Sequence, residues 1–348
     1  MMMPMHALAE ANTNIALVKY WGKNDPTLNL PAVPSLSLTL DGLTTRTEVE
    51  FDPSLSADVL WLNGAATGGE PLAKVCRHLD RVALALVGTA ERPRARVRTV
   101  NNFPTAAGLA SSASAFAALT VAAAAALTGG AAATAGEFAF DRGQLAILAR
   151  QGSGSAARSL FGGLVVLGVG TPGQVHSAQA SQLLGSSDWP ELRLVIGVVS
   201  ERAKDTSSTL GMNHTAATSP YFAPFVAAAP ADLLAATQAV LARDLTRLGE
   251  VAERSALRMH ASAMAADPGV VYLRGSTLEG LHAVRALRQH GVQAFFTCDA
   301  GPHPKALTTA ADADAVAAAL AAVPGVQRTL IARPGEGARV LPLSPEPA

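Results

Sequence analysis

Polar and apolar side chains alternate along two stretches in the first third of the chain, residues 44–51 and 94–100. This period of two is typical of half-buried antiparallel strands. Residues 164–167 and 192–199 are short, continuous apolar runs, which indicate buried strands. The pattern therefore predicts strands in both halves of the chain.

Helical periodicity occupies much of the remaining sequence, without the regular alternation of a βαβ repeat. The longest helical stretch, residues 231–263, is expected in two pieces broken near Asp244. Two more strands are predicted toward the C-terminus, at residues 293–298 and 327–332. The other helices are expected at residues 111–127, 144–150, 277–289 and 312–322.

The length of 348 residues is enough for two domains that share or divide a hydrophobic core. A polar stretch at residues 181–190 is the best boundary, so we expect an N-terminal domain at 1–188 and a C-terminal domain at 189–336. The segment after Pro334 is rich in proline and glycine, which predicts a loose tail at residues 337–348.

Composition excludes several classes of function. Lys and Arg together number 27, as do Asp and Glu, so no basic field points to nucleic acid or to an acidic membrane. Two cysteines are too few for a disulfide framework, and a reducing cytoplasm suits them. The N-terminus lacks the pattern of a secretory signal, and the alanine-rich runs are shorter than the about 20 residues that span a membrane. We expect a cytoplasmic protein with no membrane or nucleic-acid partner.

Common cofactor motifs are either absent from this sequence or lack the neighbouring secondary structure that they require. Gly168, Gly170 and Gly173 match G-x-G-x-x-G, but Pro172 interrupts the match and no helical pattern follows. No G-x-x-x-x-G-K-[ST] occurs, and the eight histidines show no metal-ligand spacing. Dinucleotide, P-loop and zinc-hydrolase chemistry are therefore not indicated.

Residues 101–119, NNFPTAAGLASSASAFAAL, have the composition of an anion site at a helix N-terminus. Small residues around Gly108 let backbone N–H groups approach an anion closely. Ser111, Ser112 and Ser114 stand at the start of the predicted helix, where the helix dipole favours negative charge. The same serines could equally cap an ordinary buried helix, so the residues alone leave both interpretations open.

Four other segments carry polar groups that fit either a binding site or a simple structural role. Residues 11–23, ANTNIALVKYWGK, end a predicted strand with two lysines. Residues 151–163, QGSGSAARSLFGG, could grip a carboxylate or phosphate, or form a flexible turn. Residues 204–220, KDTSSTLGMNHTAATSP, indicate a polar helix start. Asp299, in FFTCDAGP, leaves a buried strand, where an aspartate usually serves a turn.

The order PTAAGLASS at residues 104–112 resembles the phosphate loop of the GHMP small-molecule kinases. Within that superfamily, NIALVKYWGK at 14–23, GSGSAARS at 152–159, the segment 204–220 and DAGP at 299–302 resemble the mevalonate diphosphate decarboxylases. The resemblance implies an α+β fold in two lobes, with the active site in the cleft between them. The N-terminal lobe would be ribosomal-protein-S5-domain-2-like and the C-terminal lobe ferredoxin-like.

The same resemblance implies roles for individual residues, with ATP and Mg²⁺ as cofactors and Ser112 as a Mg²⁺ ligand. Asp299 would orient or deprotonate the C3 hydroxyl of the substrate, with Lys19 beside it and Arg158 holding the carboxylate. The implied substrate-binding residues are Asn14, Tyr20, Trp21, Gly22, Lys23, Ser153, Gly154, Ser155, Ala156, Ala157, Ser208 and Thr209. The implied ATP-binding residues are Pro104, Ala107, Gly108, Leu109, Ala110, Ser111, Ser112 and Ser114.

The implied reaction is ATP-dependent decarboxylation of mevalonate 5-diphosphate to isopentenyl diphosphate, by a homodimer. Leu72 stands where many family members have an arginine that grips the terminal phosphate. A decarboxylase acting on mevalonate 5-phosphate is therefore an alternative, unless Lys74 or Arg77 takes over that contact. His303 replaces the usual asparagine after DAGP, which exchanges an amide for an imidazole near Asp299.

Two further alternatives belong to other classes of protein. A plain GHMP kinase would share the phosphate loop but would stop at the phosphorylated product. A catalytically silent ligand sensor would not need Lys19, Arg158 and Asp299 together, and their presence argues against it.

Overall fold

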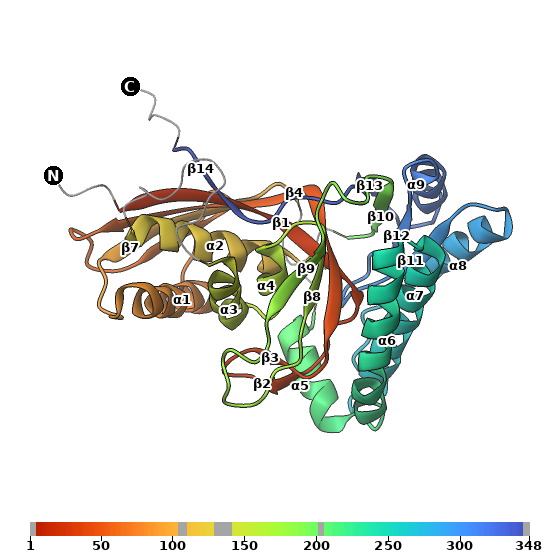
Figure 1. Cartoon of the computed structure of the whole chain (residues 1–348), viewed down its shortest axis with the longest axis horizontal. Coiled ribbons are helices and arrows are strands. Elements are labelled where there is room, and N and C mark those ends of the chain that lie inside the picture. Colours follow the sequence, from red (N-terminus) through yellow and green to blue (C-terminus); the bar gives the residue numbers. More distant parts are fainter. Residues whose placement is uncertain (1–4, 104–109, 129–140, 201–204, 344–348) are drawn as a thin grey trace.

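The computed structural model describes residues 5–103, 110–128, 141–200 and 205–343, which form two lobes side by side (Figure 1). Each lobe is built on its own sheet. The chain passes from the first sheet to the second between β9 (Ala180–Leu184) and β10 (Leu192–Val198). This crossing falls in the polar stretch where the sequence placed the domain boundary.

The N-terminal lobe contains an eight-stranded sheet of order β14-β1-β4-β7-β5-β6, with β8 on β4 and β9 on β8. Its longest strands, β1 (His6–Val18) and β4 (Ser35–Asp52), are antiparallel neighbours. Burial alternates in the second half of β4 because one face of the sheet packs on helices and the other meets solvent. The other strands are β5 (Val59–Leu62), β6 (Ala65–Ala66), β7 (Arg94–Asn101), β8 (Leu164–Leu167) and β14 (Arg339–Leu341).

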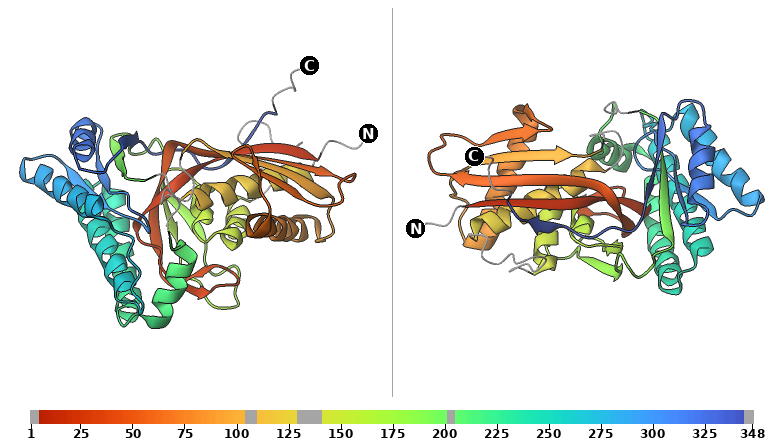
Figure 2. Two further views of the ribbon diagram at one scale, coloured as in Figure 1. Left: turned by 180° about the vertical axis from the view of Figure 1, so that it is seen from behind. Right: turned by 90° about the horizontal axis from the view of Figure 1, so that it is seen from above.

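Helices cover one face of this sheet (Figures 1 and 2). Among them, α2 is almost wholly apolar and buried, and its alanines let it lie close to β1 and β4. A small hairpin, β2 (Lys23–Asp25) with β3 (Leu30–Pro31), follows β1. The helices are α1 (Gly69–Val87), α2 (Ser111–Leu127), α3 (Arg142–Gly152) and α4 (Ala156–Ser159).

The C-terminal lobe is a four-stranded antiparallel sheet of order β11-β12-β10-β13. Helices α6 and α7 pack on one face, and α8 and α9 on the other. This strand order is that of a ferredoxin-like fold and confirms the α+β class expected from the sequence. The elements are α5 (Ser208–Thr218), α6 (Phe222–Ala242), α7 (Leu245–Met264), α8 (Gly275–Gln289), β11 (Ala294–Thr297), β12 (Lys305–Thr309), α9 (Ala313–Ala321) and β13 (Arg328–Ala332).

One buried apolar cluster crosses the boundary between the lobes. Ile15 and Leu38 from the first sheet belong to the same cluster as Ile196, Val240 and Leu248 from the second lobe. Because the two lobes share a core, we infer that the segments on either side of the boundary are held in a fixed relation.

The predicted helix at residues 111–127 and the strand at 164–167 are confirmed to the residue. The predicted break near Asp244 is also confirmed: Arg243 adopts a left-handed conformation with φ of 53°, and the Asp244 carboxylate caps α7 by accepting the Arg247 N–H. Helix α6, however, begins at Phe222, nine residues before the predicted start.

The prediction of a loose tail at residues 337–348 is wrong for the part of it that the structure describes. Residues 339–341 form β14, which pairs antiparallel with β1, and the Ala338 N–H donates to the Ser159 carbonyl. The prolines and glycines that suggested a loose tail lie outside β14. Strand β14 itself is ordered because the edge of β1 supplies partners for its backbone hydrogen bonds.

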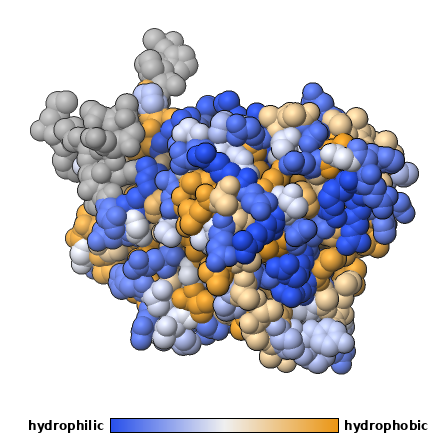
Figure 3. Space-filling model, turned by 45° about the vertical axis from the view of Figure 1, so that its right-hand side comes forward, coloured by the Kyte–Doolittle hydropathy of each residue, from blue (hydrophilic) through white to orange (hydrophobic). Residues whose placement is uncertain are grey.

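Across the described ranges, α6 is the helix long and apolar enough to cross a membrane by length and composition. It packs along α7, and its buried Asp232 accepts hydrogen bonds from Arg254 and Arg258 of that helix. Figure 3 shows hydrophilic and hydrophobic residues interspersed over the face in view. A single helix that passes this test is weak support for a membrane span, because core helices pass it too.

Candidate active site

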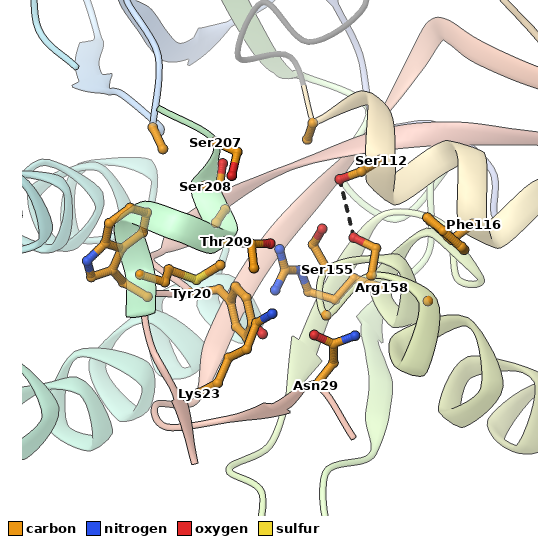
Figure 4. A pocket seen from close by; sticks show the side chains of 18 of the residues that line it. Tyr20, Lys23, Asn29, Ser112, Phe116, Ser155, Arg158, Ser207, Ser208 and Thr209 are labelled. Carbon is orange, nitrogen blue, oxygen red and sulfur yellow. Dashed lines mark hydrogen bonds between the residues drawn. The ribbon is translucent and has the colours of Figure 1, made fainter. Parts of the chain in front are cut away.

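A cavity of about 560 Å³ lies where the two lobes meet. The N-terminal lobe supplies the end of β1, the first turn of α2 and residues 151–158. The start of α5, with Ser207, Ser208 and Thr209, lies across the cavity from Ser112 (Figure 4). Asp299, which follows β11, also lines the cavity. The cavity therefore joins segments that are far apart in sequence. The predicted site residues that line it are Asn14, Lys19, Tyr20, Trp21, Lys23, Ala110, Ser111, Ser112, Ser153, Gly154, Ser155, Arg158, Ser208, Thr209 and Asp299.

Asp299 lies between two lysines. Lys19 Nζ is 2.6 Å from Asp299 Oδ1, and Lys305 Nζ is 3.2 Å from Oδ2. Both lysines are 1% exposed, whereas the Asp299 side chain is 21% exposed. Burial alone would raise the pKa of Asp299, but the charges of Lys19 and Lys305 outweigh it and hold that pKa well below its usual range.

Lys19 is held where β1 ends. Its Nζ donates to the Ala16 carbonyl at 2.7 Å as well as to Asp299, and its backbone N–H donates to Ser255 Oγ of α7. Burial lowers the pKa of Lys19, and the charge of Asp299 offsets part of that shift. An ammonium has three donors, so one remains for a ligand beyond Ala16 and Asp299.

Arg158 is anchored by polar side chains of β1 and β4. Its Nε donates to Asn14 Oδ1 at 3.1 Å and its Nη1 to Ser35 Oγ at 2.8 Å. The guanidinium also lies over the Tyr20 ring, 5.8 Å from the centroid. Burial lowers the pKa of Arg158 to about 10, so the side chain stays charged at neutral pH. Burial raises the pKa of Tyr20 to about 12, which keeps its phenol neutral.

Two helix N-termini open onto the cavity from opposite lobes. Ser111 and Ser112 start α2, and Ser112 Oγ accepts a hydrogen bond from Ser153 Oγ at 3.2 Å (Figure 4). Across the cavity, the Ser207 side chain caps α5 by accepting the Leu210 N–H, which places Ser208 and Thr209 in its first turn. Both helix dipoles favour an anion in the space between them.

Helix α1 presents a row of cations to the cavity. Lys74, Arg77 and Arg81 are spaced by three and four residues, so they share one face of the helix, and all three line the cavity. Leu72 is off this face and packs against the apolar core of the N-terminal lobe. The position of Leu72 agrees with its apolar side chain, and Lys74, Arg77 and Arg81 bring positive charge to the cavity wall.

Four predicted residues do not line the cavity, and the structure gives each a packing role. Ala156 and Ala157 are buried in the N-terminal core. Ser114 is buried and its Oγ lies 2.6 Å from Thr45 Oγ1. Gly22 has a φ of +98°, and a Cβ there would lie 2.5 Å from the Phe222 ring, so only glycine lets α6 approach.

The remaining predicted ATP-binding residues, Pro104, Ala107, Gly108 and Leu109, lie outside the described residues. His303, the departure from the family pattern, is buried and its Nδ1 accepts the Val199 N–H at 3.1 Å. It thereby ties the segment after Asp299 to the end of β10.

Sequence reasoning missed Lys305 and Arg81. Lys305 begins β12 opposite Thr297, two residues before Asp299 along the neighbouring strand. A lysine directly before the apolar run at 306–307 was the available signal, because a charge at the start of a buried strand needs a nearby partner. Arg81 belongs to α1, which the periodicity analysis did not identify.

This arrangement defines a class of protein. Buried lysines on one carboxylate, an anchored arginine and hydroxyls at two helix N-termini are typical of a site for phosphorylated ligands, such as a small-molecule phosphate and a nucleoside triphosphate. In the described part of the chain no group of three or more His, Cys, Asp or Glu residues could hold a metal by itself.

Comparisons with known proteins identify the family. Residues 11–179 match the diphosphomevalonate decarboxylase-like N-terminal domain, and residues 194–335 match the mevalonate 5-diphosphate decarboxylase C-terminal domain. The diphosphomevalonate decarboxylase of Candida albicans is 38% identical over 307 residues, covering 85% of this chain and 82% of that protein. The chain belongs to the diphosphomevalonate decarboxylase family.

Solved structures agree with this membership. Mevalonate diphosphate decarboxylase from Staphylococcus aureus superposes with a TM-score of 0.88 at 33% identity, over 97% of this chain and 98% of that chain. A structure of MDDEF in complex with MVAPP, AMPPCP and magnesium superposes with a TM-score of 0.86 at 35% identity, with the same coverage.

Proposed function

We propose that the protein decarboxylates mevalonate 5-diphosphate with ATP, giving isopentenyl diphosphate, carbon dioxide, ADP and phosphate. The observation that carries this proposal is Asp299, paired with Lys19, in the same cavity as Arg158 and the start of α2. Relatives that are 35–38% identical bear the name diphosphomevalonate decarboxylase. The names of these relatives do not support the alternative reaction on mevalonate 5-phosphate.

The chemistry requires a better leaving group than hydroxide at C3. The γ-phosphoryl group of ATP moves to the C3 oxygen, ADP leaves, and the hydroxyl proton is released to solvent. The C3–O bond then breaks, and its electron pair leaves with phosphate. The C1–C2 bond supplies the electron pair of the new C2–C3 double bond, and carbon dioxide departs.

Asp299 orients the hydroxyl in this scheme and stays negatively charged throughout. Because its pKa lies well below the usual range, it is a weak general base at neutral pH. A fixed negative charge beside C3 stabilises the positive charge that develops as phosphate leaves. Of the two roles implied by the resemblance, the charge environment favours orientation over deprotonation.

Arg158 and Lys19 hold the two anionic groups of the substrate that react. Asn14 and Ser35 fix the Arg158 guanidinium by Nε and Nη1, which leaves donors on Nη1 and Nη2 for the substrate carboxylate. The remaining Lys19 donor serves the oxygen at C3 and then the departing phosphate. Fixing carboxylate and leaving group together favours the decarboxylating geometry.

Mg²⁺ is expected with ATP, and the residues at the start of α2 fit it. The Ser112 hydroxyl is a hard oxygen donor at the cavity wall, and Mg²⁺ typically completes its shell with phosphate oxygens and water. Asp299 is engaged by Lys19 and Lys305, so we assign the metal contact to Ser112. When bound, the ion neutralises negative charge on the transferring phosphoryl group.

The diphosphate end of the substrate is assigned to Lys23, Lys74 and Arg77. Burial lowers the pKa of Lys23, and Lys74 lowers it further, so a bound anion would relieve the repulsion between these two cations. This assignment follows the alternative in which Lys74 or Arg77 takes over the contact that an arginine makes in many family members at the position of Leu72. A homodimer and a cytoplasmic location remain predictions.

The proposed function is tested by measuring ADP and carbon dioxide together, from mevalonate 5-diphosphate and mevalonate 5-phosphate in parallel. Equal amounts of ADP and carbon dioxide from the diphosphate support the proposal. ADP without carbon dioxide would identify a plain kinase. A higher kcat/KM for the monophosphate would establish the alternative substrate.

A further inference from the structure

Lys305 has no role in the proposed reaction, yet it is one of two buried lysines on Asp299. The two lysines are not equivalent, because only Lys19 lines the cavity. Lys305 is the first residue of β12, and it contacts the other carboxylate oxygen without lining the cavity. One cation is enough to form an ion pair with a carboxylate, so the second lysine on Asp299 needs a separate explanation.

The two oxygens of Asp299 face different surroundings. Oδ2, the oxygen toward Lys305, is buried, so the exposed fifth of the side chain belongs to its other atoms. A substrate hydroxyl entering the cavity therefore meets Asp299 on the side of Oδ1, where Lys19 already binds. Lys19 must then share Oδ1 with the hydroxyl or turn toward the substrate.

We propose that Lys305 is a positioning residue that keeps Asp299 ionised and oriented while Lys19 turns to the substrate. The inference rests on the proposed function. Lys305 is a counterion for Asp299 that no substrate group can contact, because Lys305 does not line the cavity. Lys19 is then free to follow the phosphoryl group, and the negative charge beside C3 persists through both chemical steps.

Three other titratable groups around Asp299, namely His260, Cys298 and Arg158, keep one charge state over the working range. Burial and the charge of Lys19 lower the pKa of His260 on α7 to about 4, and burial raises that of Cys298 to about 11. Arg158 stays protonated below its pKa of about 10. Lys19 loses a proton only as the pH rises, so it cannot cause activity to fall in acid. The terminal phosphates of the substrate and of ATP also titrate in this range, with a pKa of about 6, but they do so for every variant alike. A loss of activity between about pH 8 and pH 5 that one variant shows and the wild type does not therefore reports Asp299.

The first test replaces Lys305 by Met, which keeps length and removes charge, and by Arg, which keeps charge. In Lys305→Met the pKa of Asp299 rises, so we expect kcat to fall as the pH falls, with a midpoint above about pH 5. The wild type and Lys305→Arg should share one profile over that range, without this additional fall. Arg247→Met, on the exposed side of α7, is the control for loss of a positive charge. A Lys305→Met profile that is lower than the wild-type profile but parallel to it would overturn the proposal.

A second measurement covers the case in which Lys305→Met does not fold. Wild-type protein labelled with ¹³Cγ-aspartate is titrated in complex with mevalonate 5-diphosphate and a non-hydrolysable ATP analogue, and the Asp299 signal is identified by its loss in Asp299→Asn. We expect the carboxyl group of Asp299 to stay ionised down to about pH 5. A buried carboxyl group without a counterion would instead have a raised pKa. Protonation above about pH 6 would contradict the proposal. This titration needs no turnover, so absence of carbon dioxide release would count against the proposed function alone.

Discussion

The two ends of the cavity carry positive charge in opposite ways. At the Asp299 end, Lys19 and Lys305 are buried and paired, whereas at the α1 end the side chains of Lys74 and Arg77 are 58% and 53% exposed and share Glu70. Removing one partner of a buried pair strands the other charge, at a cost of roughly 3–5 kcal/mol. An exposed pair contributes about 0–1 kcal/mol and is screened by salt. We infer that the buried end governs the rate and the exposed end governs affinity.

The sharpest test of this difference is Asp299→Asn. The amide keeps the shape of the carboxylate but removes the charge beside C3, so we expect kcat to fall by at least about a thousandfold while substrate still binds. Calorimetric titration with substrate and steady-state kinetics measure the two effects separately. Asp314→Asn, at an exposed position of α9, is the matched control, and near-normal turnover of Asp299→Asn would refute the role given to Asp299.

Arg158→Lys addresses the other buried cation and should have the next largest effect. A lysine cannot donate to Asn14 and Ser35 and also hold a carboxylate with a planar fork, so we expect roughly a hundredfold loss in kcat/KM for the substrate. The KM for ATP should change little. Arg150→Lys is a matched control, because Arg150 is also buried and, among the described residues, its guanidinium donates to the Leu28 and Val175 carbonyls rather than to side chains of the cavity. A parallel loss of ATP affinity in Arg158→Lys would place Arg158 in the nucleotide site instead.

The sequence predicted the buried end of the cavity better than the exposed end, for a physical reason. Asp299, Lys19 and Arg158 sit within apolar strands and glycine-rich turns, where a charge is unusual enough to be noticed. Helix 111–127 was predictable because alanine makes up much of it and no glycine or proline interrupts it. Lys305 was missed because its partner is contributed by a neighbouring strand, and strand pairing is a long-range property.

The exposed end was harder to predict because helix α1 begins without a strong signal. Gly68 and Gly69 start it, and no side chain caps its N-terminus. Without the helix, the spacing of Lys74, Arg77 and Arg81 could not be recognised as one face. Strand β14 was missed for a related reason, since its order comes from pairing with β1 rather than from its own composition.

Ser112, at the start of α2, belongs neither to the Asp299 end of the cavity nor to the α1 end. We expect its substitution by Ala to have an effect between those expected for the two ends. Loss of the hydroxyl removes one oxygen near the nucleotide phosphates, so we expect the KM for ATP to rise by roughly tenfold, with a similar shift in the Mg²⁺ dependence. Ser114→Ala is the matched control, because Ser114 is buried against Thr45. That control should lower the melting temperature without changing the KM for ATP. An unchanged KM in Ser112→Ala would indicate that Ser112 only caps the helix.

The smallest effects are expected at the exposed wall of α1. We expect Lys74→Met and Arg77→Met to raise the KM for the diphosphate substrate by about two- to tenfold with little change in kcat, because exposed cations add affinity uniformly to ground and transition states. The difference from the wild type should shrink as ionic strength rises, since the Debye length falls from about 10 Å at 0.1 M salt to about 3 Å at 1 M. The same substitutions should affect the monophosphate less, because it lacks the terminal charge.

Leu72→Arg provides the contrast: Leu72 packs on the core, so an arginine there should lower stability and leave the preference between the two substrates unchanged. A clear gain of Leu72→Arg in kcat/KM for the diphosphate would show instead that position 72 reaches the substrate, and the contact assigned to Lys74 and Arg77 would be wrong.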